Sequence, residues 1–148
     1  FLEATAGRLP VEEEHTYALG LADVDGDGDL DLVAGNIGQS RLCLNDGKGY
    51  FSAAPMPVLA SNTRAVALGD VDGDGDWDLV IGSYRESAML LLNDGQGGFA
   101  DASAGRLAAT CDLAACLADL DGDGDLDLAA SGGIFRNDGK GVFSVVQV

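Results

Sequence analysis

Aspartate recurs at alternate positions in three short segments of this chain, and each segment has the composition of a cation-binding loop. The segments are DVDGDGDLD, DVDGDGDWD and DLDGDGDLD, at residues 23–31, 70–78 and 119–127. Carboxylate oxygens are the ligands that hard divalent cations prefer, and glycine between them lets the backbone turn sharply. Because crowded carboxylates repel each other and no basic residue lies within a segment, each loop is expected to need a cation to hold its shape.

The spacing assigns a role to each aspartate. In such a loop, carboxylates at positions 1, 3, 5 and 9 can surround a calcium ion while the carbonyl of position 7 completes the ligand set. The predicted side-chain ligands are Asp23, Asp25, Asp27 and Asp31, then Asp70, Asp72, Asp74 and Asp78, and then Asp119, Asp121, Asp123 and Asp127. The predicted carbonyl donors are Asp29, Asp76 and Asp125.

Other frames and other metals fit the pattern less well. Moving the frame by two residues puts an aliphatic residue at position 9 of every loop, and an EF-hand would need a glutamate at position 12, where all three loops are aliphatic. An all-protein cage of carboxylates suits calcium better than magnesium. One histidine and three dispersed cysteines offer zinc no tetrahedral set. We therefore expect about three calcium ions, one per loop.

A second element follows each acidic loop. Its sequences are LNDGKGYF, LNDGQGGF and RNDGKGVF, at residues 44–51, 92–99 and 136–143. The acidic loops begin 47 and 49 residues apart, a period typical of propeller blades or of helical repeats. Short apolar runs bounded by Gly, Asn and Asp, without a capped helical segment, favour strands. The chain is predicted to be all-β, with three consecutive four-stranded antiparallel propeller-type blades.

Each unit is predicted to have an inner strand before the acidic loop, a second strand after it, a third strand, and a fourth strand after an Asn-Asp-Gly hairpin, since Asn and Gly tolerate positive φ. In the middle unit we expect strands at residues 65–69, 78–82 and 89–92, and a fourth that begins at Phe99. The repeat divides the chain into residues 1–50, 51–98 and 99–148. Because residues 1–9 match residues 99–107, one fourth-strand segment is left over.

Charge and composition exclude several classes of protein. The formal net charge is −17, and the acidic residues are concentrated in the three loops. No basic patch could neutralise nucleic acid, and no apolar run is long enough to span a membrane. The chain begins at Phe1 rather than at methionine, so we expect a processed or excised segment. Cys43 is expected in the core, while Cys111 and Cys116 can form a disulfide only if the chain bends between them.

The remaining candidate residues do not form a catalytic set. His15 is the one histidine and is expected to be a solvated loop residue. Trp77 replaces leucine at position 8 of its loop, where packing between blades is favoured over stacking on a sugar. Arg8 and Arg106 occupy equivalent repeat positions, which indicates a structural role between blades.

The repeats resemble the FG-GAP/VCBS family, whose members form the blades of integrin-α-type β-propellers and of many bacterial cell-surface and secreted proteins. The resemblance rests on the D-x-D-x-D-G-x-x-D loops and the L-N-D-G-x-G-x-F elements, and it covers essentially the whole chain. It implies a calcium ion between the first and second strands of each blade, an extracellular location, and work in adhesion or ligand recognition. The name-giving dipeptides are only partly kept, which fits the bacterial branch better than the integrin branch.

The number of blades departs from the family pattern. Closed propellers have about four to eight blades, and three blades leave two open apolar faces. The expected partners are other copies of the chain, in a ring or a head-to-tail filament, or flanking blades of a longer chain. The expected function is a non-enzymatic extracellular module for adhesion or self-assembly, with structural calcium. A calcium-dependent lectin-like domain that binds a glycan or a protein is the alternative, and part of a secreted hydrolase is a third interpretation.

Overall fold

The computed structural model describes residues 7–10, 15–57, 62–108 and 113–146. Those residues form twelve strands and no helix, so no described segment is a helix that could cross a membrane. The strands are β1 (Thr16–Ala22), β2 (Asp31–Asn36), β3 (Arg41–Asn45), β4 (Phe51–Ala54), β5 (Thr63–Gly69), β6 (Asp78–Ser83), β7 (Met89–Asn93), β8 (Phe99–Asp101), β9 (Ala115–Ala118), β10 (Asp127–Ala130), β11 (Gly133–Asn137) and β12 (Phe143–Val145).

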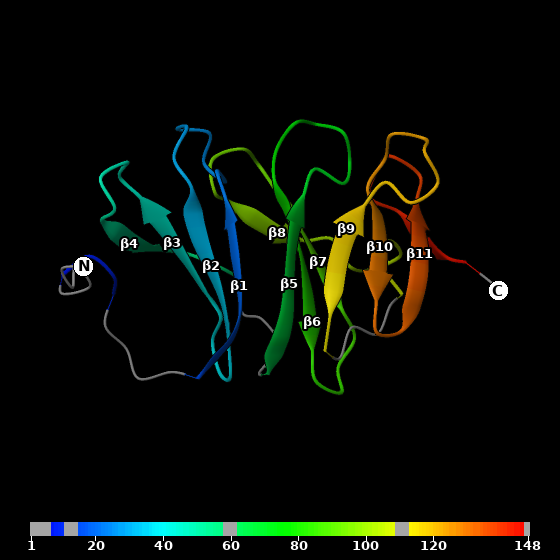
Figure 1. Cartoon of the computed structure of the whole chain (residues 1–148), viewed down its shortest axis with the longest axis horizontal. Coiled ribbons are helices and arrows are strands. Elements are labelled where there is room, and N and C mark those ends of the chain that lie inside the picture. The colour runs from blue at the N-terminus through cyan, green and yellow to red at the C-terminus, as the bar shows by residue number, and fades with distance from the viewer. Residues whose placement is uncertain (1–6, 11–14, 58–61, 109–112, 147–148) are drawn as a thin grey trace.

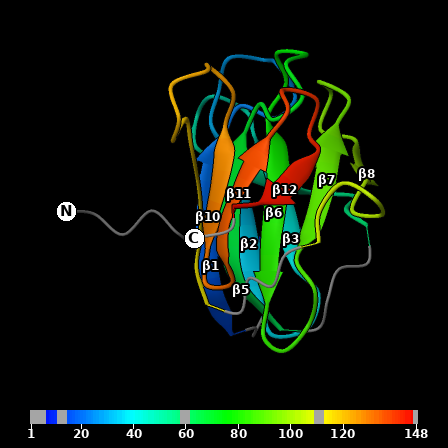
Figure 2. The same ribbon diagram turned by 90° about the vertical axis from the view of Figure 1, so that its right-hand side faces the viewer.

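The strands form three separate antiparallel sheets of four, and in each sheet neighbouring strands follow one another in the chain. Figure 1 shows the sheets side by side as three blades, with β1, β5 and β9 as the adjacent inner strands. Figure 2 looks onto the third blade, with the second blade behind it. The set is not closed, because the first and third blades lie at opposite ends. The predicted all-β fold of three four-stranded propeller-type blades is confirmed.

The acidic loops join the first two strands of every blade, and all three lie at the same end of the molecule (Figure 1). In each blade the aspartate at position 9 pairs with the last residue of the inner strand. These pairs are Asp31 with Ala22, Asp78 with Gly69, and Asp127 with Ala118. The sheets group residues 16–54, 63–101 and 115–145, whereas the proposed division at residues 50 and 98 places β4 and β8 at the start of the following repeat unit and leaves β12 in the third.

Two apolar cores lie between the blades, and β6 contributes side chains to both cores. Leu79 and Ile81 pack with Leu42 and other residues of the first blade, whereas Val80 packs with Phe135 and other residues of the third. Every residue of β6 is buried, because the second blade is covered on both faces. Each fully buried aliphatic side chain contributes about 1.5–3 kcal/mol. Stacking of blades therefore accounts for most of the apolar burial.

The Asn-Asp-Gly segments form the predicted hairpins between the third and fourth strands. Gly47 and Gly49 have φ angles of 71° and 77°, as expected, but Arg85 is the only non-glycine residue with positive φ in the described part of the chain. Asn45 is instead the last residue of β3 and pairs with Phe51. The predicted hairpin is therefore present, with positive φ at its glycines and an extended backbone at Asn45.

Candidate metal centre

Each acidic loop brings three carboxylates together, with oxygen atoms that all lie within 4.8 Å of one another. The groups are Asp23, Asp25 and Asp27, then Asp70, Asp72 and Asp78, and then Asp119, Asp121 and Asp127. Positions 1 and 3 thus converge in every loop, joined by position 5 in the first loop and by position 9 in the other two. Asp31, Asp74 and Asp123 lie outside these groups. Ligation by all four positions of each loop stays a prediction.

The aspartate at position 1 shapes the loop through backbone hydrogen bonds. Oδ1 of Asp23 accepts hydrogen bonds from the N–H groups of Gly26 at 2.9 Å and Asp27 at 3.1 Å, and Oδ2 accepts one from Gly28 at 2.9 Å. The equivalent glycines bond Asp70 and Asp119 in the same way. The chain therefore wraps around the first carboxylate and aims the following carboxylates inward.

The aspartate at position 9 is a buried clamp between two hairpins. Asp78 is 0% exposed. Its Oδ2 accepts the N–H of Val71 at 3.0 Å, and its Oδ1 accepts the N–H of Asn93, also at 3.0 Å. Asp31 and Asp127 hold the equivalent N–H groups. This residue therefore ties position 2 of the acidic loop to the Asn-Asp-Gly hairpin of its own blade, a role that the sequence spacing did not reveal.

The side chain at position 7 turns away from the carboxylate group. Asp76 lies against Gly95, where an added Cβ would come within 2.7 Å of its carboxylate oxygens. Asp29 and Asp125 lie against the equivalent Gly47 and Gly139. This arrangement leaves the backbone carbonyl of position 7 as the group it could offer a cation, the role that the spacing predicts.

The second loop gives the clearest indication that a carboxylate lacks a positively charged partner. Oδ1 of Asp72 is buried and has no hydrogen-bond partner among the described residues. Burial raises the pKa of Asp72, and repulsion from the Asp74 carboxylate raises it further. Burial also raises the pKa of Asp78 to about 6, although two backbone N–H groups act in the opposite direction. A buried carboxylate oxygen without a partner is costly, and a hard cation would satisfy it, so the donor set fits calcium.

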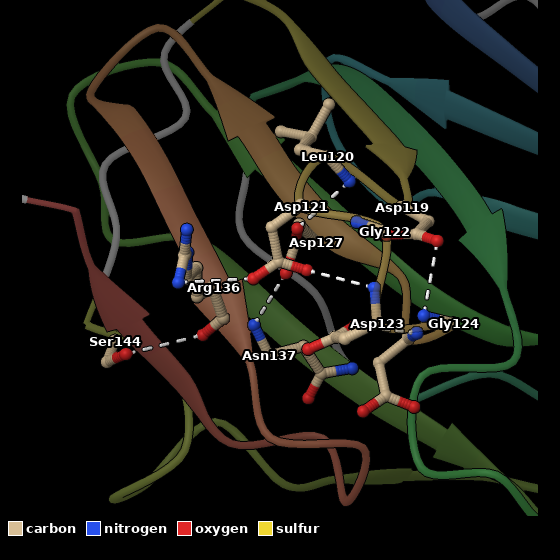
Figure 3. Close-up of polar contacts among 11 residues, drawn as sticks. Asp119, Leu120, Asp121, Gly122, Asp123, Gly124, Asp127, Arg136, Asn137 and Ser144 are labelled. Atoms are coloured by element: carbon tan, nitrogen blue, oxygen red, sulfur yellow. Dashed lines mark hydrogen bonds and ion pairs between the residues drawn. The ribbon is translucent and has the colours of Figure 1, made fainter.

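The third loop has a basic neighbour, and no ion pair to either of the other loops is found among the described residues. Arg136 of β11 lies 3.2 Å from Oδ2 of Asp121, and Figure 3 shows its guanidinium directed at that carboxylate. Leu44 and Leu92 occupy the equivalent position in the other blades. Sequence reasoning missed this ion pair, although the change from LNDG to RNDG was its signal. The positive charge offsets part of the repulsion in this loop.

The Asn-Asp-Gly hairpin of one blade bonds the acidic loop of the preceding blade. Nδ2 of Asn93 donates to the carbonyl of Val24 at 2.8 Å, and the N–H of Gly97 donates to the same carbonyl at 2.9 Å. Nδ2 of Asn137 donates to the carbonyl of Val71 at 2.7 Å. Each accepting carbonyl belongs to position 2 of its loop. The shape of an acidic loop is therefore coupled to the docking of the next blade.

Two of the other predicted roles can be assessed in the structure. The guanidinium of Arg106 donates to the carbonyl of Lys140 at 2.8 Å, and its own carbonyl accepts the N–H of Phe143 at 2.7 Å, which confirms a structural role between the second and third blades. His15 is exposed. Trp77 is 44% exposed, and its predicted packing between blades stays a prediction.

The cysteines are only partly described. Cys43 is buried, as predicted, and Cys116 is exposed. Both are free thiols, and Cys111 lies outside the described residues.

Replacement of Asp72 by asparagine is expected to have opposite effects without and with calcium. Without metal, Asp72→Asn removes a buried charge beside Asp70 and Asp74, so the free energy of unfolding should not fall. With metal, loss of a predicted ligand should weaken calcium binding at that loop by about tenfold or more. Calorimetric titration combined with urea unfolding would measure both effects. Equal calcium affinity in variant and parent would contradict the assigned role.

Comparison with known proteins gives one family and a similar solved fold. The sequence pattern of the family described as FG-GAP-like repeat matches residues 23–81 and 70–130. A solved structure concerned with specific recognition of non-reducing terminal N-acetylglucosamine by an Agrocybe aegerita lectin is similar, with a TM-score of 0.59 and 24% identity over 87% of this chain. The match covers 37% of that lectin chain, so this chain spans well under half its length. At this identity the likeness shows the fold alone. No curated protein matches the chain.

Proposed function

Because this chain belongs to the FG-GAP-like repeat family, we propose that it is a non-enzymatic extracellular module whose acidic loops bind structural calcium and whose surfaces serve adhesion or self-assembly. The observation that supports the calcium most directly is the buried, unpartnered Oδ1 of Asp72 within a group of converging carboxylates. Carboxylates committed to a cation cage are poor general acids, which argues against hydrolytic chemistry in the loops.

The proposed calcium ion would neutralise the carboxylates that the fold crowds together. In the second loop Asp70, Asp72, Asp74 and Asp78 would hold it with their side chains, and Asp76 with its carbonyl. The first and third loops offer the equivalent sets. The ion would supply positive charge at the junction of the first two strands and the following hairpin, so its effect would be to stiffen the blades and not to activate a substrate.

Calorimetric titration of the metal-free chain with calcium tests this proposal. We expect binding at about three sites, one per loop, with magnesium much weaker because it demands a smaller and more regular cage. Triple replacement of the position-1 residues, Asp23→Asn, Asp70→Asn and Asp119→Asn, should remove the binding. Unchanged calcium binding in that variant would refute the assignment of the loops.

A lectin-like function is the second candidate, because a cavity of about 520 Å³ opens between the first and second blades. Leu44, Met56, Gly97 and Phe99 are among its lining residues, so it combines apolar side chains with backbone polar groups. A glycan screen with calcium present would separate the two functions. Specific binding that is lost in Phe99→Ala would favour the lectin-like function, and an empty screen would favour the adhesion or assembly module.

A further inference from the structure

Each blade has two different faces, which we name by their neighbours. The front face packs against the preceding blade, and the back face packs against the following one. In the second blade the front face includes Leu68 and Leu79, which join the core shared with the first blade. Its back face includes Ala67, Val80 and Leu90, which join the core shared with the third blade. Both internal interfaces therefore pair a back face with a front face.

The open end of the first blade is a front face. Leu19 and Leu21 of β1 correspond to Val66 and Leu68 of β5 by their pairing with the second strand. They are 64% and 59% exposed, whereas Val66 and Leu68 pack into the core between the first two blades. Leu19 lines a surface hollow of about 300 Å³ together with Leu32, Cys43 and the N-terminal residues Leu9 and Pro10.

The open end of the third blade is a back face. Cys116 and Ile134 correspond to Ala67 and Leu90, which are buried between the second and third blades. Cys116 is exposed, and Ile134 is 44% exposed. Figure 2 looks onto this sheet, and no described strand covers it. The outer faces of the first and third blades therefore match the faces that pack at the internal interfaces.

Among the described residues, the first and third blades each have one group that lacks its counterpart of these hydrogen bonds between blades. Nδ2 of Asn137 has two acceptors, the carbonyl of Leu126 in its own blade at 3.1 Å and that of Val71 in the preceding blade at 2.7 Å. Nδ2 of Asn45 donates to the carbonyl of Leu30 at 3.1 Å, and no second acceptor for it lies in the described residues. The carbonyl of Leu120, at position 2 of the third loop, likewise has no donor there.

We propose that a second copy of this chain docks its front face on the back face of the third blade, with Asn45 of the second copy donating to the carbonyl of Leu120. This inference rests on the proposed function, since it names the surface through which the module would assemble. Its occupant is a second copy because the two internal interfaces already show how this sequence packs on itself. The contact is heterologous, so repeated docking gives a ring or an open series.

The internal interface also predicts which side chains would meet. A Cβ added to Gly20, on the back face of the first blade, would lie 2.8 Å from Cδ1 of Leu68 on the front face of the second. Cys116 occupies the position of Gly20 in the third blade, and Leu21 occupies the position of Leu68 in the first. Docking therefore brings Cys116 of one copy beside Leu21 of the other.

Docking should depend on the cation in the third loop. The N–H of Leu120 donates to Oδ2 of Asp127 at 3.0 Å, as Figure 3 shows, so the acidic loop fixes the residue whose carbonyl would accept Asn45. A loop splayed by repulsion would misplace this carbonyl. By linkage, docking should also strengthen calcium binding at the third loop.

Disulfide trapping tests the proposed contact. In a Cys111→Ser background, Leu21→Cys should give disulfide-linked copies through Cys116 under mild oxidation with calcium, and much less with chelator. Adding Cys116→Ser should abolish them. Val145→Cys is the matched control, since Val145 is also exposed but shares a face with the buried Phe135, so it should not cross-link. Equal cross-linking by Leu21→Cys and Val145→Cys would overturn the proposal.

Sedimentation of charge variants gives an independent measurement. Ile134→Glu should lower association with calcium at least tenfold while leaving the unfolding midpoint of the monomer unchanged, and Val145→Glu should leave both unchanged. A chain that binds three calcium ions but stays monomeric would overturn this inference and spare the calcium sites. Equal association with calcium and with chelator would refute the proposed dependence of docking on the cation. Failure to bind calcium at all would refute the proposed function itself.

Discussion

Chelation of calcium is expected to lower the unfolding midpoint of this chain by more than about 10 °C. A ligand that binds only the folded state contributes about 4 kcal/mol when its concentration is 1,000 times Kd. For a chain of this size, 1 kcal/mol corresponds to about 2–4 °C, so a single saturated site contributes about 8–16 °C. Without the ion, the carboxylates of each loop repel each other at the junction of the first two strands. Circular dichroism melts with calcium and with chelator would measure the difference.

A pair of variants separates specific binding from general charge screening. Asp70→Asn removes a predicted side-chain ligand, so it should reduce the response to calcium by about one site. Asp76→Asn should keep the full response, because Asp76 is predicted to ligate through its backbone carbonyl and its side chain lies against Gly95. Both variants remove one negative charge. An equal loss of response in both would mean that calcium acts only by screening.

Replacement of Asp78 by alanine is expected to destabilise the metal-free chain by about 3–5 kcal/mol, before any loss of calcium binding is counted. The reason is the clamp, since the N–H groups of Val71 and Asn93 would both lose their acceptor in a buried site. A buried donor left unpaired costs about 1–3 kcal/mol, and here there are two. Urea unfolding of the metal-free protein would measure the loss without any contribution from calcium binding.

Asp76→Ala is the matched control for this measurement. It removes an aspartate from the same loop, but no described hydrogen bond uses the Asp76 side chain as acceptor, so its effect should stay within about 1 kcal/mol. Asp78→Asn should fall between the two, because the amide keeps one acceptor oxygen for one of the N–H groups. If Asp78→Ala were no more destabilising than Asp76→Ala, the clamp would not be a major source of stability.

The architecture could be predicted from the sequence because each local signal repeats. The strands predicted at residues 65–69, 78–82 and 89–92 lie within β5, β6 and β7, and the fourth strand begins at Phe99 as expected. Loop spacing also placed the aspartates at positions 1 and 3 of every loop side by side. These features depend on residues that are close together in the sequence, and the spacing of residue types along the sequence indicates them directly.

Contacts between blades could not be predicted in the same way. The bond from Asn93 to Val24 joins residues 69 positions apart, and no local pattern specifies it. The sequence predicts the hairpin that contains the asparagine, but it does not predict that the asparagine amide reaches the preceding blade. The pairing of Arg136 with Asp121 was missed for a related reason. The arginine occurs in only one of the three repeats, so no recurring pattern indicates its partner.

The bonds from each hairpin to the preceding loop make a single blade an incomplete folding unit. The carbonyl at position 2 of an acidic loop gains its hydrogen bond only when the next blade supplies its asparagine. The smallest segment that contains a complete loop therefore spans parts of two blades. Truncation between sheets would leave one loop without its donor and one hairpin without its acceptor. Unfolding should therefore proceed inward from the two ends, with the loop shared by the second and third blades protected longer from amide hydrogen exchange than the loop at the third blade's open edge.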